Sequence, residues 1–290
     1  MNEIKELFEI LYKQKKIIFA TSFLCSTLFL SISFTFDDQY ESESTILVKS
    51  LGSNSNFGTI NNFSLGFDLL GSGNKGTYLQ RSLAFFYSIE FARIIQNNDK
   101  TLPLLFATEG YDKEKNETII NYDIYDPKTK VWTRDKPFPF DGKPQDIEIL
   151  RKIKSTLDIF LNSNSGFIEI KVRSKSPIAA YELSENFISF ANNFIVSQDL
   201  SEIDEAIKLT DQLVSQNISK LGLQDSLSLI KEENLKKKIY IQSSANFPLQ
   251  KVQSPYIDIN RVFPNRIFFI MIGFFIGFIL SSTFILLRFK

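Results

Sequence analysis

The sequence predicts an α+β protein in which two transmembrane helices flank a large mixed domain that carries one very long helix. Three observations lead to this fold class. Uncharged apolar stretches occupy residues 17–36 and 267–287, about 230 residues of mixed polarity lie between them, and a helical pattern runs through 177–245. Each apolar stretch has the ~20 residues that a helix needs to cross a ~30 Å hydrocarbon core.

The first apolar stretch sets the orientation. Basic residues precede it at Lys5, Lys13, Lys15 and Lys16, whereas none follows it until Lys49. Since positive charge stays in the cytoplasm, we expect residues 1–16 to be a cytoplasmic segment. A secretory signal peptide is the competing interpretation, but the apolar run is longer than the usual ~7–15 residues, and Ser31-Ile32-Ser33 is a weak cleavage signal.

The second apolar stretch is ambiguous by itself. Arg261 and Arg266 precede it, and Arg288 and Lys290 follow it. Two spans return the chain to the side where it began, so we expect a cytoplasmic tail at 288–290 and residues 37–266 outside the cytoplasm. Within this stretch Gly273 and Gly277 form a Gly-x-x-x-Gly pair, which favours close packing between membrane helices, although glycine is also common in such helices.

The intervening domain shows alternating strand and helix patterns. Period-two alternation and β-branched residues predict strands, and three- and four-residue apolar steps predict helices. Strands are expected at 40–50, 118–125, 130–133 and 166–173, and helices at 77–97 and 146–162, with a Gly- and Ser-rich loop at 51–76. The prolines Pro248, Pro255 and Pro264 predict an extended linker before the second span, which in a functional interpretation sets how the second helix leans on the first.

The longest predicted element begins at Ser176 and Pro177. Serine as N-cap with proline at the first helical position is a strong start signal. An unbroken helix from 177 to about 245 would reach ~100 Å. Gly222 is the expected kink, since glycine costs about 1 kcal/mol relative to alanine inside a helix. A helix that outreaches its own domain predicts self-assembly into a homo-oligomer.

Composition excludes several function classes. The chain has no histidine, which removes His-based catalysis and His-ligated metals. Lys and Arg total 33, as do Asp and Glu, so no basic excess indicates nucleic acid. Cys25, the single cysteine, falls in the first apolar stretch, so a disulfide within the loop domain is impossible. We expect no catalytic, cofactor-binding or metal-binding residues, and therefore no enzyme.

Three short motifs carry little weight. Residues 71–77 superficially resemble a phosphate-binding loop but have Lys before Gly instead of after it, which favours a flexible linker. Lys236, Lys237 and Lys238 are candidate contacts for a glycan or an anionic lipid, but such a run is usually a solvated helix face. Glycosylation-type triplets begin at Asn116 and Asn217 and are short enough to arise by chance.

The order of these features resembles the polysaccharide co-polymerases, the Wzz-type chain length determinants of O-antigen and related glycans. The resemblance is carried by the 4–11 segment leading through a lysine cluster into the first span, and by the strand at 40–48. It continues with Ser176-Pro177-Ile178-Ala179-Ala180 opening a long helix, and with prolines before a glycine-containing second span. The chain departs from the family in its shortness, its sparser prolines and Gly222.

The resemblance implies a periplasmic α/β base domain in the bacterial inner membrane, with a long helix protruding from it. It further implies ring-like homo-oligomers that act with a membrane-bound polysaccharide polymerase on the growing lipid-linked glycan. The leading hypothesis is therefore a non-enzymatic regulator of modal chain length. The alternative is an exopolysaccharide or capsule export adaptor of similar architecture. A sensor is a third interpretation, which the three-residue tail disfavours.

Overall fold

The computed structural model describes residues 12–49, 77–135, 142–162, 167–215, 221–244 and 246–288. The chain divides into two compact units. Unit 1 comprises Met1–Tyr40 and Ile259–Lys290, and unit 2 comprises Glu41–Asp258. The mixed helix and strand fold with two apolar helices near the termini confirms the predicted fold class.

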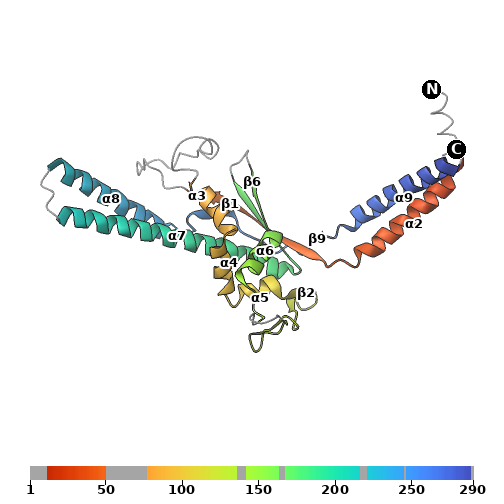
Figure 1. Cartoon of the computed structure of the whole chain (residues 1–290), viewed down its shortest axis with the longest axis horizontal. Helices are drawn as coiled ribbons and strands as arrows, with labels where there is room; N and C mark the ends of the chain where they lie inside the picture. The colour runs from red at the N-terminus through yellow and green to blue at the C-terminus, as the bar shows by residue number, and fades with distance from the viewer. Residues whose placement is uncertain are drawn as a thin grey trace, which may run out of the picture. The chain divides into compact units, whose positions relative to one another are not determined.

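Unit 1 is built on the helices α2 (Lys15–Ser33) and α9 (Arg266–Arg288), which lie side by side (Figure 1). Helix α9 contains the whole predicted stretch 267–287, whereas α2 ends three residues before the predicted end at 36. Both are long and apolar enough to cross a membrane. Strand β9 (Arg261–Phe263) pairs antiparallel with the first residues of β1 (Gln39–Val48). The Phe36 ring contacts the rings of Phe263 and Phe269 at centroid distances of 5.6 and 5.7 Å. This aromatic cluster joins the ends of the helices to the strand pair.

Unit 2 contains a mixed α/β core. Its main sheet has the strand order β6 (Leu157–Leu161), β7 (Ile168–Ser174), β1 and β8 (Leu249–Gln253). The pairs β6–β7 and β1–β8 are antiparallel. Two small hairpins, β2–β3 (Thr108–Asp112, Glu117–Ile120) and β4–β5 (Tyr125–Asp126, Val131–Trp132), lie outside this sheet. Strand β1 thus places residues from the start of the loop domain beside residues from its end.

The core of unit 2 forms where helices pack on the sheet. The short helices are α3 (Thr77–Phe86), α4 (Ile89–Gln96), α5 (Thr101–Phe106) and α6 (Asp146–Thr156). The Phe91 ring contacts those of Phe86 and Phe187 at 5.5 and 5.2 Å, edge to face. Fully buried aliphatic residues complete the core: Ile95, Ile149, Ile153, Ile170, Val172, Leu183 and Ile188.

Several predicted boundaries are wrong for tertiary reasons. The helix expected over 146–162 ends at Thr156, and the next five residues form β6 because they pair with β7. The helix expected over 77–97 is broken at Ser88, whose side chain caps α4 by accepting a hydrogen bond from the Phe91 amide. The expected linker before the second span contains β8 and β9, both paired with β1.

The long helix expected over 177–245 is two helices. Helix α7 (Pro177–Ser215) starts where predicted, but the chain then reverses, and α8 (Leu221–Ser243) runs back along it (Figure 1). At 39 residues α7 is ~58 Å long, well short of the expected ~100 Å. The expected kink at Gly222 is also wrong, because Gly222 lies in the first turn of α8. Contacts between the two helices replace some of the partners that a single helix would need.

Candidate functional site

Small residues line the contact between α2 and α9. A Cβ atom built on Gly277 would lie 2.6 Å from Ser22 Cα, and one built on Gly273 would lie 2.9 Å from Ser26 Cα. The lower-numbered glycine thus meets the higher-numbered serine, so the two helices are antiparallel. The Gly-x-x-x-Gly pattern predicted a packing role for the two glycines but not for Ser22 and Ser26, which have the same four-residue spacing.

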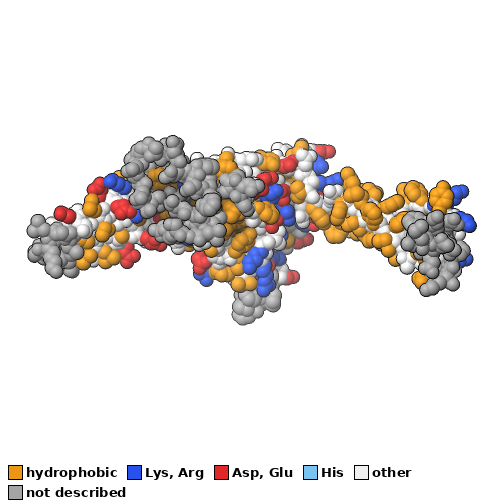
Figure 2. Space-filling view, turned by 90° about the horizontal axis from the view of Figure 1, so that it is seen from above, with side chains coloured by type: hydrophobic (Ala, Val, Ile, Leu, Met, Phe, Trp, Pro, Cys, Tyr) orange, Lys and Arg blue, Asp and Glu red, His pale blue; other side chains and the backbone are white. Residues whose placement is uncertain are grey.

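The outer surface of this pair is apolar. Ser22, Ser26, Gly273 and Gly277 are buried, whereas large side chains such as Phe19 and Phe275 are 65% and 62% exposed. Large hydrophobic side chains cover much of the pair in Figure 2. A core helix of a water-soluble protein shows the opposite arrangement. Small residues inside and large apolar residues outside are typical of helices packed in lipid, where close backbone approach drives association.

Ser176 and Pro177 open α7 as the sequence indicated. Pro177 is the first helical residue, and Ser176 is buried just before it. The Ser176 hydroxyl lies 2.7 Å from that of Thr118 and accepts a long, 3.4 Å hydrogen bond from the Ala179 amide. The serine therefore caps the helix and also ties its start to β3.

The three prolines before α9 are all buried. Pro248 immediately precedes β8, and its carbonyl accepts a 2.8 Å hydrogen bond from the Lys49 amide. Pro255 follows β8, and Pro264 follows β9 in unit 1. The structure thus places each proline at the end of a short paired strand, where its missing amide donor interrupts no ladder.

Lys236, Lys237 and Lys238 already have partners. Lys236 and Lys237 pair with Glu232 and Glu233 one turn earlier, and Lys238 reaches across to Asp204 of α7 at 2.5 Å. A second inter-helix pair joins Lys231 to Asp211 at 2.5 Å. With these partners, the three lysines belong to the charged, solvated surface of the α7–α8 hairpin.

A buried acid that no sequence pattern predicted lies on α7. Asp199 accepts hydrogen bonds from the Tyr78 hydroxyl and from Arg81, both at 2.7 Å. Burial, and then the bond to Asp199, raise the pKa of the Tyr78 hydroxyl well above its ordinary value. The tyrosine stays protonated and keeps donating, so the network fixes α3 against α7.

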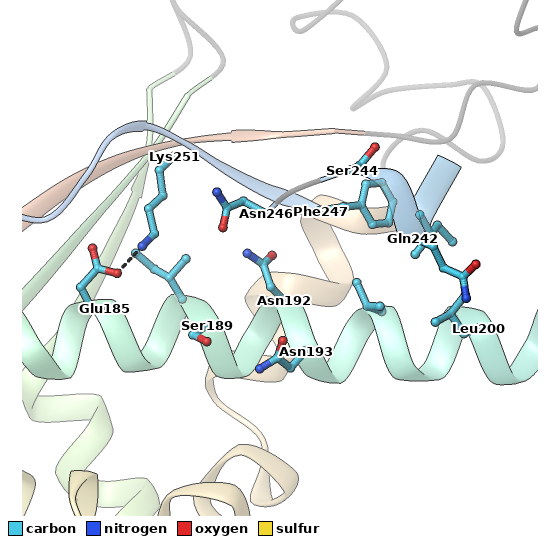
Figure 3. Close-up of a pocket in the computed structure, with 13 residues that line it drawn as sticks. Glu185, Ser189, Asn192, Asn193, Leu200, Gln242, Ser244, Asn246, Phe247 and Lys251 are labelled. Atoms are coloured by element: carbon cyan, nitrogen blue, oxygen red, sulfur yellow. Dashed lines mark hydrogen bonds and ion pairs between the residues drawn. The ribbon is translucent and has the colours of Figure 1, made fainter. Parts of the chain in front are cut away.

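A polar pocket of about 360 Å³ lies between α7 and residues 241–251 (Figure 3). Asn192 on α7 connects the two walls of the pocket. Its side chain accepts a hydrogen bond from the Leu249 amide at 2.8 Å and donates one to the Leu249 carbonyl at 3.2 Å. An ion pair between Glu185 and Lys251 closes one end. The sequence offered no signal for this pocket, because its two walls are about 50 residues apart in the chain.

The described residues contain no cluster of three or more His, Cys, Asp or Glu side chains able to hold a metal ion. The pocket has a single acid, Glu185, and that acid is paired with Lys251.

Comparison with known proteins finds a family model and a solved structure that are similar to this chain. The family model of the Wzz chain length determinant protein matches residues 2–103, which confirms the resemblance over that part of the chain. Among solved structures, a full-length bacterial polysaccharide co-polymerase is similar, with 14% sequence identity over 97% of this chain and 96% of that chain, at a TM-score of 0.32. A search of the curated proteins finds no match.

Proposed function

We propose that the chain is a non-enzymatic inner-membrane protein that regulates the modal chain length of O-antigen or a related surface polysaccharide. The observation that carries the proposal is the match of residues 2–103 to the chain length determinant model. That range includes α2, the first apolar helix, and β1, the strand that follows it.

The proposed mechanism is that of a membrane-anchored scaffold. Helices α2 and α9 cross the membrane with both ends of the chain in the cytoplasm, and residues 37–266 lie in the periplasm. The lysines before α2 and the apolar outer surface of the helix pair support this topology. Several copies assemble in a ring and act together with the polymerase, which forms the glycosidic bonds on the lipid-linked glycan.

Gene deletion with complementation tests the function. Deletion should convert a glycan ladder with a modal length on a gel into an unmodulated distribution, and the wild-type gene should restore the mode. An unchanged ladder contradicts the proposal. Complete loss of surface polymer would instead support the alternative, an export adaptor. Size measurement in detergent tests assembly, since a monomer is incompatible with the scaffold.

A further inference from the structure

The pocket between α7 and residues 241–251 combines an apolar floor with a polar rim. Three floor residues are buried, namely Ile188, Ile241 and Phe247. The Phe247 ring is held edge to face by Tyr78 and Tyr240 at centroid distances of 5.3 and 5.8 Å. Together with the Asn192 contacts, this packing forms the pocket before any ligand arrives, which lowers the entropic cost of binding.

The rim consists of side-chain amides. Asn193, Gln242 and Asn246 line the pocket, and within the described part of the chain their side chains make no hydrogen bond. Asn246 stands at φ 59°, and Figure 3 shows it facing Asn192 across the pocket. Each amide offers donors and an acceptor, which is the combination that a hydroxyl group matches.

The charge of the lining favours an uncharged ligand. Glu185 and Lys251 are the charged residues of the lining, and they pair with each other. A phosphate or a sugar acid would find no unpaired cation there. The volume of about 360 Å³ lies near the lower end of the ~300–1,000 Å³ typical of small-molecule sites.

We propose that this pocket binds a short, neutral saccharide segment, whose C–H face packs on the floor around Phe247 while its hydroxyls bond the rim amides. The proposal rests on the proposed function, because the growing glycan would supply the ligand. It names a place on the chain where the polymer is held while its length is regulated.

Direct binding tests the site. Fragments a few repeat units long, released by mild acid from the surface glycan of the source bacterium, are titrated into the full chain in detergent. The triple variant Asn193→Ala, Gln242→Ala and Asn246→Gly removes the three amides, and glycine suits the positive φ at 246. We expect its affinity to fall at least about tenfold, because each amide loses a hydrogen bond.

The control is Gln212→Ala, an exposed amide elsewhere on α7, which should bind like the wild type. Inorganic phosphate at the same concentration should not displace the fragments. Equal affinity in the triple variant, displacement by phosphate, or no saturable binding to the wild type overturns the proposal. Each single variant is measured as well, so that a folding defect in the triple variant leaves the question answerable.

The gel ladder separates this proposal from the proposed function. If deletion of the gene destroys the modal length but fragments do not bind, the saccharide site is wrong and the chain-length function stands. If deletion leaves the ladder unchanged, the chain-length function is wrong, whatever the fragments do.

Discussion

The protein contains two antiparallel helix pairs that are built on opposite rules. In α2–α9 most buried residues are serine and glycine, with Ile18 and Ile285 beside them, and most large apolar side chains point outward. In α7–α8 the contact combines buried isoleucines such as Ile203 and Ile241 with ion pairs between the helices. Lipid gives no hydrophobic gain for bringing apolar faces together, so close backbone packing dominates there, whereas water rewards apolar burial and solvates charged rims.

Helix α7 also buries a charged side chain where it packs against α3, whereas neither α2 nor α9 buries a charged side chain at their contact. Asp199 on α7 is nearly inaccessible, but it has both Tyr78 and Arg81 as donors. In α2, by contrast, the polar atoms at the contact are hydroxyls: that of Ser26 donates to the Ser22 carbonyl one turn earlier, and that of Ser22 is buried without a partner among the described residues. A hydroxyl can be satisfied within its own helix, whereas a carboxylate needs partners from elsewhere.

The largest expected effect is on the apolar part of α7–α8. Ile241 is 2% exposed and packs in the cluster with Ile203 and Phe247. We expect Ile241→Ala to lower the free energy of unfolding by about 2–5 kcal/mol, since it removes buried methyl groups and leaves a cavity. Thermal unfolding in detergent, followed by circular dichroism, measures it. The control is Ile239→Ala on the same helix, where the side chain is exposed; an equal loss there would contradict the role of burial.

The next effect tests the small-residue contact of α2–α9. A leucine at 277 would force the helices apart, because even its Cβ would lie 2.6 Å from Ser22 Cα. We expect Gly277→Leu to destabilise the pair by about 1–3 kcal/mol through overpacking. Thermal stability in detergent is compared with that of Ile279→Leu, a change at an exposed position of the same helix. If both variants melt alike, the glycine is not a packing residue.

The smallest effect concerns the ion pairs of α7–α8. Lys238→Gln removes the pair with Asp204, whose side chain is about half exposed. We expect a loss of about 0.2–1 kcal/mol, the range of surface pairs. The loss should shrink as salt is added, because salt screens exposed charges. Denaturant titrations at low and high salt measure it. A loss that does not change with salt would place the contribution in packing instead of charge.

Part of the contact between α2 and α9 was predictable from the sequence. The Gly273–Gly277 spacing predicted a packing motif, and the structure puts both glycines against α2. The partner serines have the same four-residue spacing but were not predicted, whereas the rim amides carried no signal, because asparagine and glutamine are common on exposed surfaces. Asn192 lies in the middle of α7. Only the structure shows that its side-chain amide bonds both the backbone amide and the backbone carbonyl of Leu249, as a neighbouring strand would.

The sequence by itself determined the properties that depend on neighbouring residues: two apolar lengths, the lysines before the first of them, and the Ser176-Pro177 helix start. Tertiary structure alone decided that the long helical pattern folds back as α7 and α8, and that residues near both ends of the loop domain share one sheet. The physical reason is that a 3.6-residue apolar period is the same in one straight helix and in two antiparallel ones. Contacts such as Lys231 with Asp211, far apart along the chain, distinguish the two.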